Sequence, residues 1–114
     1  YLRFCQMLLN GGKLGKVRLL KESSVQQMNL SAKGVKGVPM GGNAEFGLGF
    51  RVLLEKNRQG MSQGSYNWGG YASTTFQIDP ANNLILIGMT QKVPTDNGFT
   101  EGFKSAVYSA IKKK

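Results

Sequence analysis

Two strand-like runs joined by a short turn constrain this chain more than any other feature of its sequence. Residues 72–78 (ASTTFQI) and 84–90 (LILIGMT) are rich in β-branched and apolar side chains. Between them stands DPANN, residues 79–83, whose residue types favour tight turns. A parallel pair would need a crossover of about a dozen residues or more, so this connection can only join antiparallel neighbours. The sequence therefore predicts a β-hairpin, in which Asp79 holds the turn and performs no chemistry.

The rest of the chain predicts helices on both sides of a small sheet. Apolar residues recur at helical spacing over 1–10, and Gly11 can cap that helix; a second, short helix is predicted over 23–28. Alternating apolar residues predict one strand within 44–56, and a final helix is expected with Thr100 as its N-cap. The remaining segments are predicted to be irregular: 12–20, 31–43 and 57–65. Together these patterns indicate an α+β fold with an antiparallel sheet flanked by helices, in a single domain over 1–114.

Several catalytic and metal chemistries are excluded by composition. The chain has no histidine, so no Ser-His or Cys-His mechanism can operate within it. Its one cysteine, Cys5, excludes an internal disulfide and a thiolate zinc cluster, and its apolar neighbours predict a core thiol. The carboxylates form no pair at metal or acid–base spacing, and no dinucleotide or phosphate-loop fingerprint is complete, so no metal and no cofactor are predicted. Ser109 and Lys112 have Ser-x-x-Lys spacing, but so close to the end of the sequence they are expected to be solvated.

The net charge of +9 raises the possibility of a nucleic-acid partner. Four basic residues are scattered through 13–21, three form the run 112–114, and the others are spread along the chain, without a recognition-helix pattern or interleaved aromatic residues. A solvated basic surface is therefore predicted, and no nucleic-acid partner. No apolar run approaches the roughly 20 residues of a membrane helix, so no membrane partner is expected either.

Trp68-Gly69-Gly70, directly before the predicted hairpin, is the candidate for function. Glycine weakens a strand interior, so a pair of glycines marks a place where something approaches the backbone closely. One interpretation is a β-bulge beside an aromatic residue. The other is a strand edge lying along a ligand, with the N–H of Tyr71 directed at a substrate oxygen as an oxyanion donor.

The order of four segments resembles a known superfamily. YLRFCQMLLNGGKL, RLLKESSVQQM, FGLGFRVL and WGGYASTTFQIDPANNLILIGMTQ follow one another as in the carboxy-terminal third of the serine β-lactamases and penicillin-binding proteins. The similarity is greatest to the branch of class C β-lactamases and related esterases. It runs from about Tyr1 to Gln91, and the block around Trp68 is its most specific part.

This resemblance implies a fold and a partial active site. The expected fold is the carboxy-terminal portion of the β-lactamase-like fold, an antiparallel sheet flanked by helices. Trp68-Gly69-Gly70 resembles the variant that replaces Lys-Thr-Gly on the substrate-edge strand, which makes these three residues candidate substrate-binding residues. By the same match, Tyr71 supplies a backbone N–H of the oxyanion hole, and its bulky side chain narrows the site. Tryptophan in place of lysine removes the cation that would hold a β-lactam carboxylate, which favours an ester over a β-lactam.

The nucleophilic Ser-x-x-Lys and the Tyr-x-Asn element precede this region in the superfamily, and neither stands here at a matching position. The chain is therefore predicted to be a fragment of a serine hydrolase acting on a small-molecule ester or amide, inactive without a missing amino-terminal segment. The alternative is a non-catalytic assembly module, a homo-oligomer or a chain that a second chain completes. The resemblance is compatible with a bacterial periplasmic or cytoplasmic protein and does not decide between them.

Overall fold

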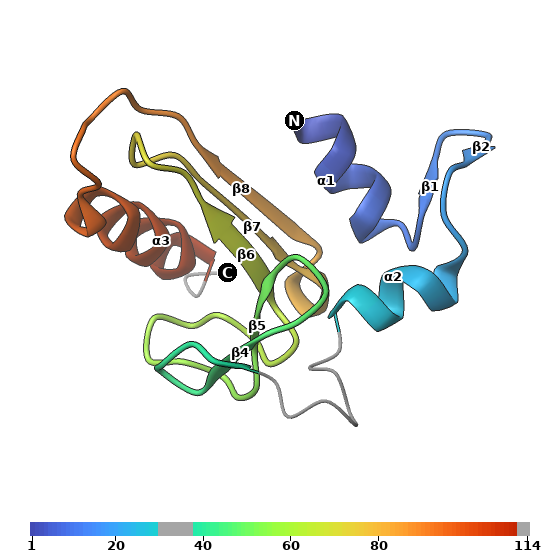
Figure 1. Ribbon diagram of the computed structural model, residues 1–114, viewed down its shortest axis with the longest axis horizontal. Helices are drawn as coiled ribbons and strands as arrows, with labels where there is room; N and C mark the ends of the chain where they lie inside the picture. The colour runs from blue at the N-terminus through green and yellow to red at the C-terminus, as the bar shows by residue number, and fades with distance from the viewer. Residues whose placement is uncertain (30–37, 112–114) are drawn as a thin grey trace.

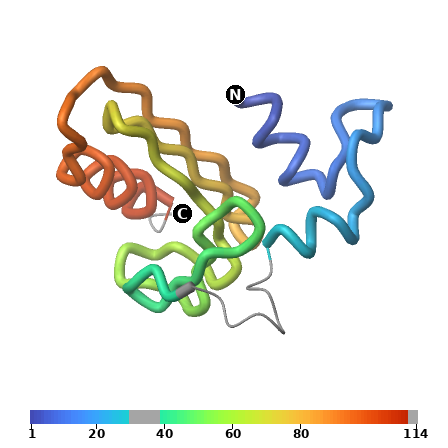
Figure 2. Tube along the Cα trace, viewed as in Figure 1, coloured from blue at the N-terminus to red at the C-terminus, as the bar shows by residue number. Residues whose placement is uncertain are grey.

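A six-stranded antiparallel sheet organises the fold. The computed structural model describes residues 1–29 and 38–111, and Figures 1 and 2 trace its course. Each strand pairs with the next along the chain, in the order β3-β4-β5-β6-β7-β8. The strands are β3 (Val38–Pro39), β4 (Ala44–Phe46), β5 (Arg51–Leu53), β6 (Tyr66–Gly69), β7 (Thr75–Asp79) and β8 (Leu84–Gly88).

Helices cover both faces of this sheet, which confirms the predicted α+β fold. Helices α1 (Leu2–Leu9) and α2 (Glu22–Asn29) lie on one face, and α3 (Asn97–Ile111) lies on the other (Figure 1). Side chains alternate along each strand, so each strand contributes to two cores. Cys5 and Leu8 of α1 pack with Ile78 on one face, whereas Tyr108 of α3 packs with Leu86 on the other. Cys5 is fully buried, as predicted, and burial raises the pKa of its thiol.

The predicted hairpin is present, with shifted boundaries. β7 and β8 pair from Thr75↔Gly88 to Asp79↔Leu84, and a short 3-10 helix, η1 (Pro80–Asn82), makes the turn. Asp79 accepts a hydrogen bond from the backbone N–H of Asn82 at 3.2 Å, so it holds the turn as expected. Asn83 completes the turn with a positive φ of 49°, a conformation that asparagine tolerates better than most residues.

The single strand predicted over 44–56 is wrong, because it is two strands. β4 ends at Phe46 and β5 begins at Arg51, and the two pair antiparallel. Between them Gly49 has a φ of 97°, which reverses the chain, and the N–H of Gly47 donates to the carbonyl of Phe50 at 2.7 Å. The apolar alternation runs through this turn without a break, so the period-2 pattern concealed it.

Two further predictions also need correction. The segment 12–20, predicted to be irregular, contains a small antiparallel hairpin of β1 (Lys13–Leu14) and β2 (Val17–Arg18) around Gly15. Helix α3 begins at Asn97, three residues before the predicted cap at Thr100, because Asp96 accepts a hydrogen bond from the N–H of Gly98 at 2.8 Å.

The loop predicted over 31–43 lies partly outside the described residues. These exclude 31–37, and β3 occupies 38–39. In the described ranges, no helix is both long and apolar enough to cross a membrane.

Candidate active site

The glycine pair lies where strand β6 turns into β7. Gly69 is the last residue of β6, and residues 70–74 form the hairpin loop. The N–H of Gly70 donates to the carbonyl of Thr74 at 2.9 Å, and the N–H of Ser73 donates to the carbonyl of Gly70 at 3.1 Å. A Cβ atom on Gly70 would lie 2.3 Å from Thr74 Oγ1. A side chain at position 70 would therefore require Thr74 to rotate or the loop to shift. Periodicity gave no strand over 66–69, because the glycine pair interrupts the pattern, but β6 agrees with the strand-edge interpretation of Trp68-Gly69-Gly70.

Trp68 and Gly69 lie on a stretch of β6 that is locally an edge of the sheet. Strand β5 pairs with β6 only at Tyr66 and Asn67. Beyond that point, Trp68 and Gly69 pair with β7 alone. The Trp68 side chain is 42% exposed, and its ring meets the ring of Phe46 edge-on at 5.1 Å. Among the described strands, β6 therefore has no partner on its β5 side beyond Asn67.

Tyr71 follows this edge as a largely exposed residue. Its residue surface is 75% exposed. In the part of the chain that the structure describes, no hydrogen bond uses the N–H of Tyr71, while its carbonyl accepts from Thr95 Oγ1 at 2.8 Å. The preceding N–H, of Gly70, is directed inward to Thr74. The loop thus fixes the Tyr71 backbone and leaves its donor available.

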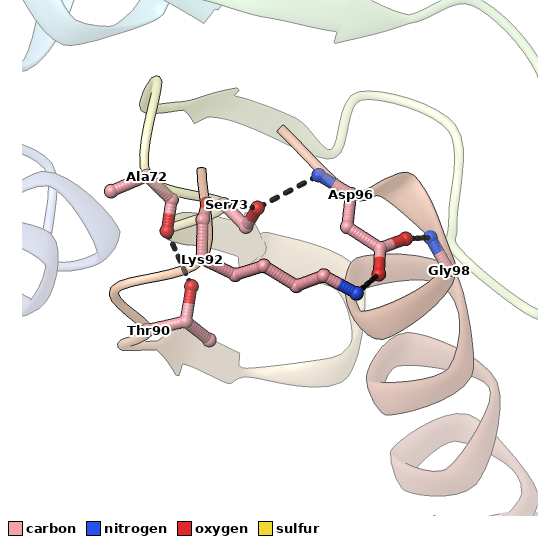
Figure 3. Close-up of polar contacts among 6 residues, drawn as sticks. All are labelled: Ala72, Ser73, Thr90, Lys92, Asp96 and Gly98. Carbon is pink, nitrogen blue, oxygen red and sulfur yellow. Dashed lines mark hydrogen bonds and ion pairs between the residues drawn. The ribbon is translucent and has the colours of Figure 1, made fainter. Parts of the chain in front are cut away.

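Residues between β8 and α3 clamp this loop, as Figure 3 shows. Ser73 is buried with a φ of 62°; its hydroxyl donates to the carbonyl of Lys92 at 2.9 Å and accepts from the N–H of Asp96 at 2.8 Å. Thr90 Oγ1 donates to the carbonyl of Ala72. Lys92 and Asp96 form an ion pair, and the hydrogen bond from Lys92 lowers the pKa of the Asp96 carboxyl. Sequence reasoning missed these residues, because TQKVPTDNG shows only the composition of a loop.

Two hollows meet at the end of β6. A hollow of about 320 Å³ has a mostly apolar lining that includes Tyr1, Phe76 and Met89. A larger and more polar groove of about 1110 Å³ lies between the sheet, residues 55–61 and α3. Trp68, Gly69 and Gly70 line both of them. The residues that the sequence singled out therefore form part of the lining of both hollows.

The opposite end of β7 carries a buried polar network. The Asp79 carboxylate accepts four hydrogen bonds, from Ser62 N at 3.1 Å, Asn82 N at 3.2 Å, Asn82 Nδ2 at 2.8 Å and Tyr108 Oη at 2.8 Å. Burial alone would raise the pKa of Asp79, but these hydrogen bonds outweigh it and lower the pKa below its usual value. Burial and the adjacent Asp79 raise the pKa of Tyr108. This network joins α3 to the sheet.

The described residues contain no group of three or more His, Cys, Asp or Glu placed to hold a metal ion. Lys112, the partner that Ser109 would need, lies outside the described residues.

Comparison with known proteins gives a consistent result. The protein family described as Beta-lactamase matches residues 1–107. The protein Rv1367c of Mycobacterium tuberculosis is 32% identical over an alignment that covers 82% of this chain and 26% of that protein. Among solved structures, unliganded simvastatin synthase (LovD) from Aspergillus terreus aligns with a TM-score of 0.78 at 23% identity, covering 100% of this chain and 33% of that one. EstCE1, a hydrolase with promiscuous acyltransferase activity, aligns with a TM-score of 0.71 at 22% identity. That alignment covers 91% of this chain and 27% of the EstCE1 chain. This chain thus spans about a quarter of the curated relative and about a third of the LovD chain.

Proposed function

Because this chain belongs to the β-lactamase family, we propose that it forms one wall of the acyl-transfer site of a serine hydrolase. In this proposal Trp68, Gly69 and Gly70 bind the substrate along the end of β6, and the backbone N–H of Tyr71 is an oxyanion donor. The observation that carries it is the unused N–H of Tyr71, which directly follows Gly70; Gly70 lines both hollows, and Tyr71 itself lines neither.

These residues would contribute to catalysis by electrostatic stabilisation. When a serine attacks an ester or amide carbonyl, negative charge develops on the carbonyl oxygen, and fixed N–H donors stabilise it. Tyr71 would be one donor, and the N–H of the nucleophile itself would be the other. The hydrogen bonds of Ser73 and Thr95 hold the loop in place, so little reorganisation is needed as charge develops.

The nucleophile is proposed to come from outside this chain. Ser73, the serine closest in sequence to the glycine pair, is buried and uses its hydroxyl in two hydrogen bonds to the clamping segment. The relatives are about three to four times longer, which leaves room for a serine and its base in the remainder of such a protein. We therefore expect no turnover of a chromogenic ester by the purified 114-residue chain. Turnover that co-elutes with the pure chain would contradict this.

An ester with an apolar acyl group fits this wall better than a β-lactam. Trp68 stands where a lysine would supply the cation for a β-lactam carboxylate. The hollow of about 320 Å³ beside it has a mostly apolar lining, which favours a small hydrophobic group. The similarity to EstCE1, a hydrolase with promiscuous acyltransferase activity, also supports acyl transfer to water or to another acceptor.

A backbone donor can be tested by a pair of substitutions at one position. The test protein joins this chain to the nucleophile-bearing part of a β-lactamase-family esterase. Tyr71→Ala removes the side chain and keeps the N–H, whereas Tyr71→Pro removes the N–H as well. We expect Tyr71→Pro to lower kcat by about 10²- to 10³-fold relative to Tyr71→Ala, the range measured for losing one oxyanion donor. Equal kcat values in two variants with matching thermal unfolding would refute the assignment.

A second candidate function is assembly with another chain. β8 is the last strand of the described sheet, and near it Met89, Tyr71 and Tyr1 are each at least 70% exposed. An open strand edge beside exposed apolar side chains favours pairing with a second copy or with a covering segment. Light scattering should then give a mass above that of the monomer, and a strictly monomeric chain at high concentration would argue against this candidate.

A further inference from the structure

The polar groove on the α3 face contains a buried lysine that has no partner among the described residues. Lys104 lines the groove and is only 7% exposed. Over 1–29 and 38–111, no hydrogen bond or ion pair involves its amine. Lysine residues are almost never this buried unless they are paired. The burial of Lys104 without a hydrogen-bond partner therefore needs a physical explanation.

The fold directs Lys104 at the sheet rather than at solvent. It stands one turn before Tyr108 on the same side of α3, and Tyr108 Oη is hydrogen-bonded to Gln77 and Asp79 on β7. Burial lowers the pKa of Lys104; nearby Glu101 acts to raise it, and nearby Arg51 to lower it further. An anion in the groove would offset the burial of this amine.

A second buried donor lines the same groove. Asn67 is 6% exposed, and its Nδ2 has no hydrogen-bond partner in the described part of the chain. The acceptor across the ladder, Gln77 Oε1, is likewise without a partner there, so Asn67 is not held by its neighbour on β7. Arg51, opposite Asn67 on β5, lines the groove too and donates from one guanidinium nitrogen to the carbonyl of Gly41 at 3.2 Å. An ammonium, an amide N–H₂ and a guanidinium thus lie around one space.

Neither of the two glutamates lining this groove forms an ion pair with Lys104, although Glu101 lies close enough to oppose the lowering of its pKa by burial. Glu101 accepts a hydrogen bond from Gln59, and Glu55 accepts one from Asn43 at 2.8 Å. Both glutamates are exposed, whereas Lys104 and Asn67 are buried. The other charged residues lining the groove, Lys56 and Arg58, are basic. The groove thus combines a net positive lining with a buried, unpaired amide donor, Asn67 Nδ2, and with the amine of Lys104, which makes no hydrogen bond to a described residue.

We propose that this groove binds the oxyanion group of a small molecule, a carboxylate or a phosphate, between Lys104, Asn67 and Arg51. Planar or tetrahedral oxyanions accept charge-assisted hydrogen bonds from this set of donors. Trp68, Gly69 and Gly70 line another part of the same groove, so a molecule carrying this group could extend toward the end of β6. The inference does not depend on the role proposed for Tyr71.

The experiment is a titration of the whole chain with succinate and, separately, with inorganic phosphate, at ionic strength held constant with chloride. Binding is followed by the side-chain NMR signals of Asn67 and by the Cε signal of Lys104. Saturable shifts at both residues are expected for at least one of the two anions, and the anion that binds identifies the carboxylate or the phosphate class. An absence of saturable shifts with both anions would overturn the proposal.

A matched pair of variants separates a site from general attraction to a basic protein. Lys104→Met is expected to weaken binding by about tenfold or more. Lys16→Met, in the exposed turn between β1 and β2, makes the same change in net charge and should alter affinity less than about twofold. Equal weakening by both variants would overturn the proposal. If Lys104→Met does not fold, the unsubstituted chain still decides the question, because saturating anion must raise the pKa of Lys104, and an unchanged pKa would count against the site.

Discussion

The two ends of strand β7 carry turns of opposite character. At one end, the turn over residues 79–83 is held by its own first residue, because Asp79 is fully buried and bonds Asn82 directly. At the other end, the loop over 70–74 exposes Tyr71 and is held by residues from beyond β8. The first turn stabilises the fold, whereas the second leaves a backbone donor unused. Distant residues support both turns, but those around Asp79 bury its carboxylate, whereas those around Ser73 leave Tyr71 exposed.

The largest effect is expected from removing the centre of the first turn. Asp79→Ala leaves the buried hydroxyl of Tyr108 and the half-buried N–H of Ser62 without their acceptor, and it frees the exposed Asn82, which water can reach. We expect the free energy of unfolding to fall by about 4 kcal/mol, since each orphaned buried donor costs about 1–3 kcal/mol. Urea unfolding measures this loss. A loss no larger than that of a typical surface substitution would show that the network is not important for stability.

The loss of stability in Asp79→Ala should depend on pH, because the Asp79 carboxylate titrates in acid. The folded pKa of Asp79 lies below its unfolded value, so its contribution to stability is complete above the unfolded pKa of about 4. It is lost as the pH falls through the folded pKa. The difference in stability between the unsubstituted chain and Asp79→Ala should therefore be constant near neutral pH and shrink in acid. A difference that grows as the pH falls would contradict the assignment.

A smaller effect is expected at the entrance to the second turn. Gly70→Ala places a Cβ within 2.3 Å of Thr74 Oγ1, so the threonine must rotate or the loop must shift. We expect a loss of about 2 kcal/mol in stability, as for other overpacked positions. Gly102→Ala is the control, because no atom lies within 4 Å of its added Cβ, and it should stabilise α3 by about 0.5–1 kcal/mol. Combining Gly70→Ala with Thr74→Ala should recover part of the loss.

The smallest change in stability is expected at the clamp. Ser73→Ala removes the hydroxyl that bonds Lys92 and Asp96, at a cost of about 1 kcal/mol. Its main effect should be local, as faster amide hydrogen exchange at Tyr71 and Ala72 with little change in β7. Ser105→Ala, on the exposed side of α3, should leave exchange at Tyr71 unchanged. Equally fast exchange throughout β7 would mean that both turns belong to one cooperative unit.

Sequence reasoning succeeded where structure is local. The helical spacing of Cys5 and Leu8 predicted α1, and the composition of residues 79–83 predicted the hairpin and the role of Asp79. It failed where one alternating apolar pattern runs through two strands, as it does through β4 and β5 on either side of Gly49. Glycine appears in the sequence without its φ, so a turn inside an alternating apolar run has no distinct signal.

The sequence by itself determined the fold family. It also named the glycine pair and Tyr71 as candidate site residues. Only the tertiary structure showed that Ser73, Lys92 and Asp96 hold the loop, and that Lys104 lies buried beside Asn67. The physical reason is range: caps, turns and alternation depend on neighbours a few residues apart. A clamp or a groove depends on residues about 20 to 40 positions apart, and their contacts exist only once the sheet and α3 have packed.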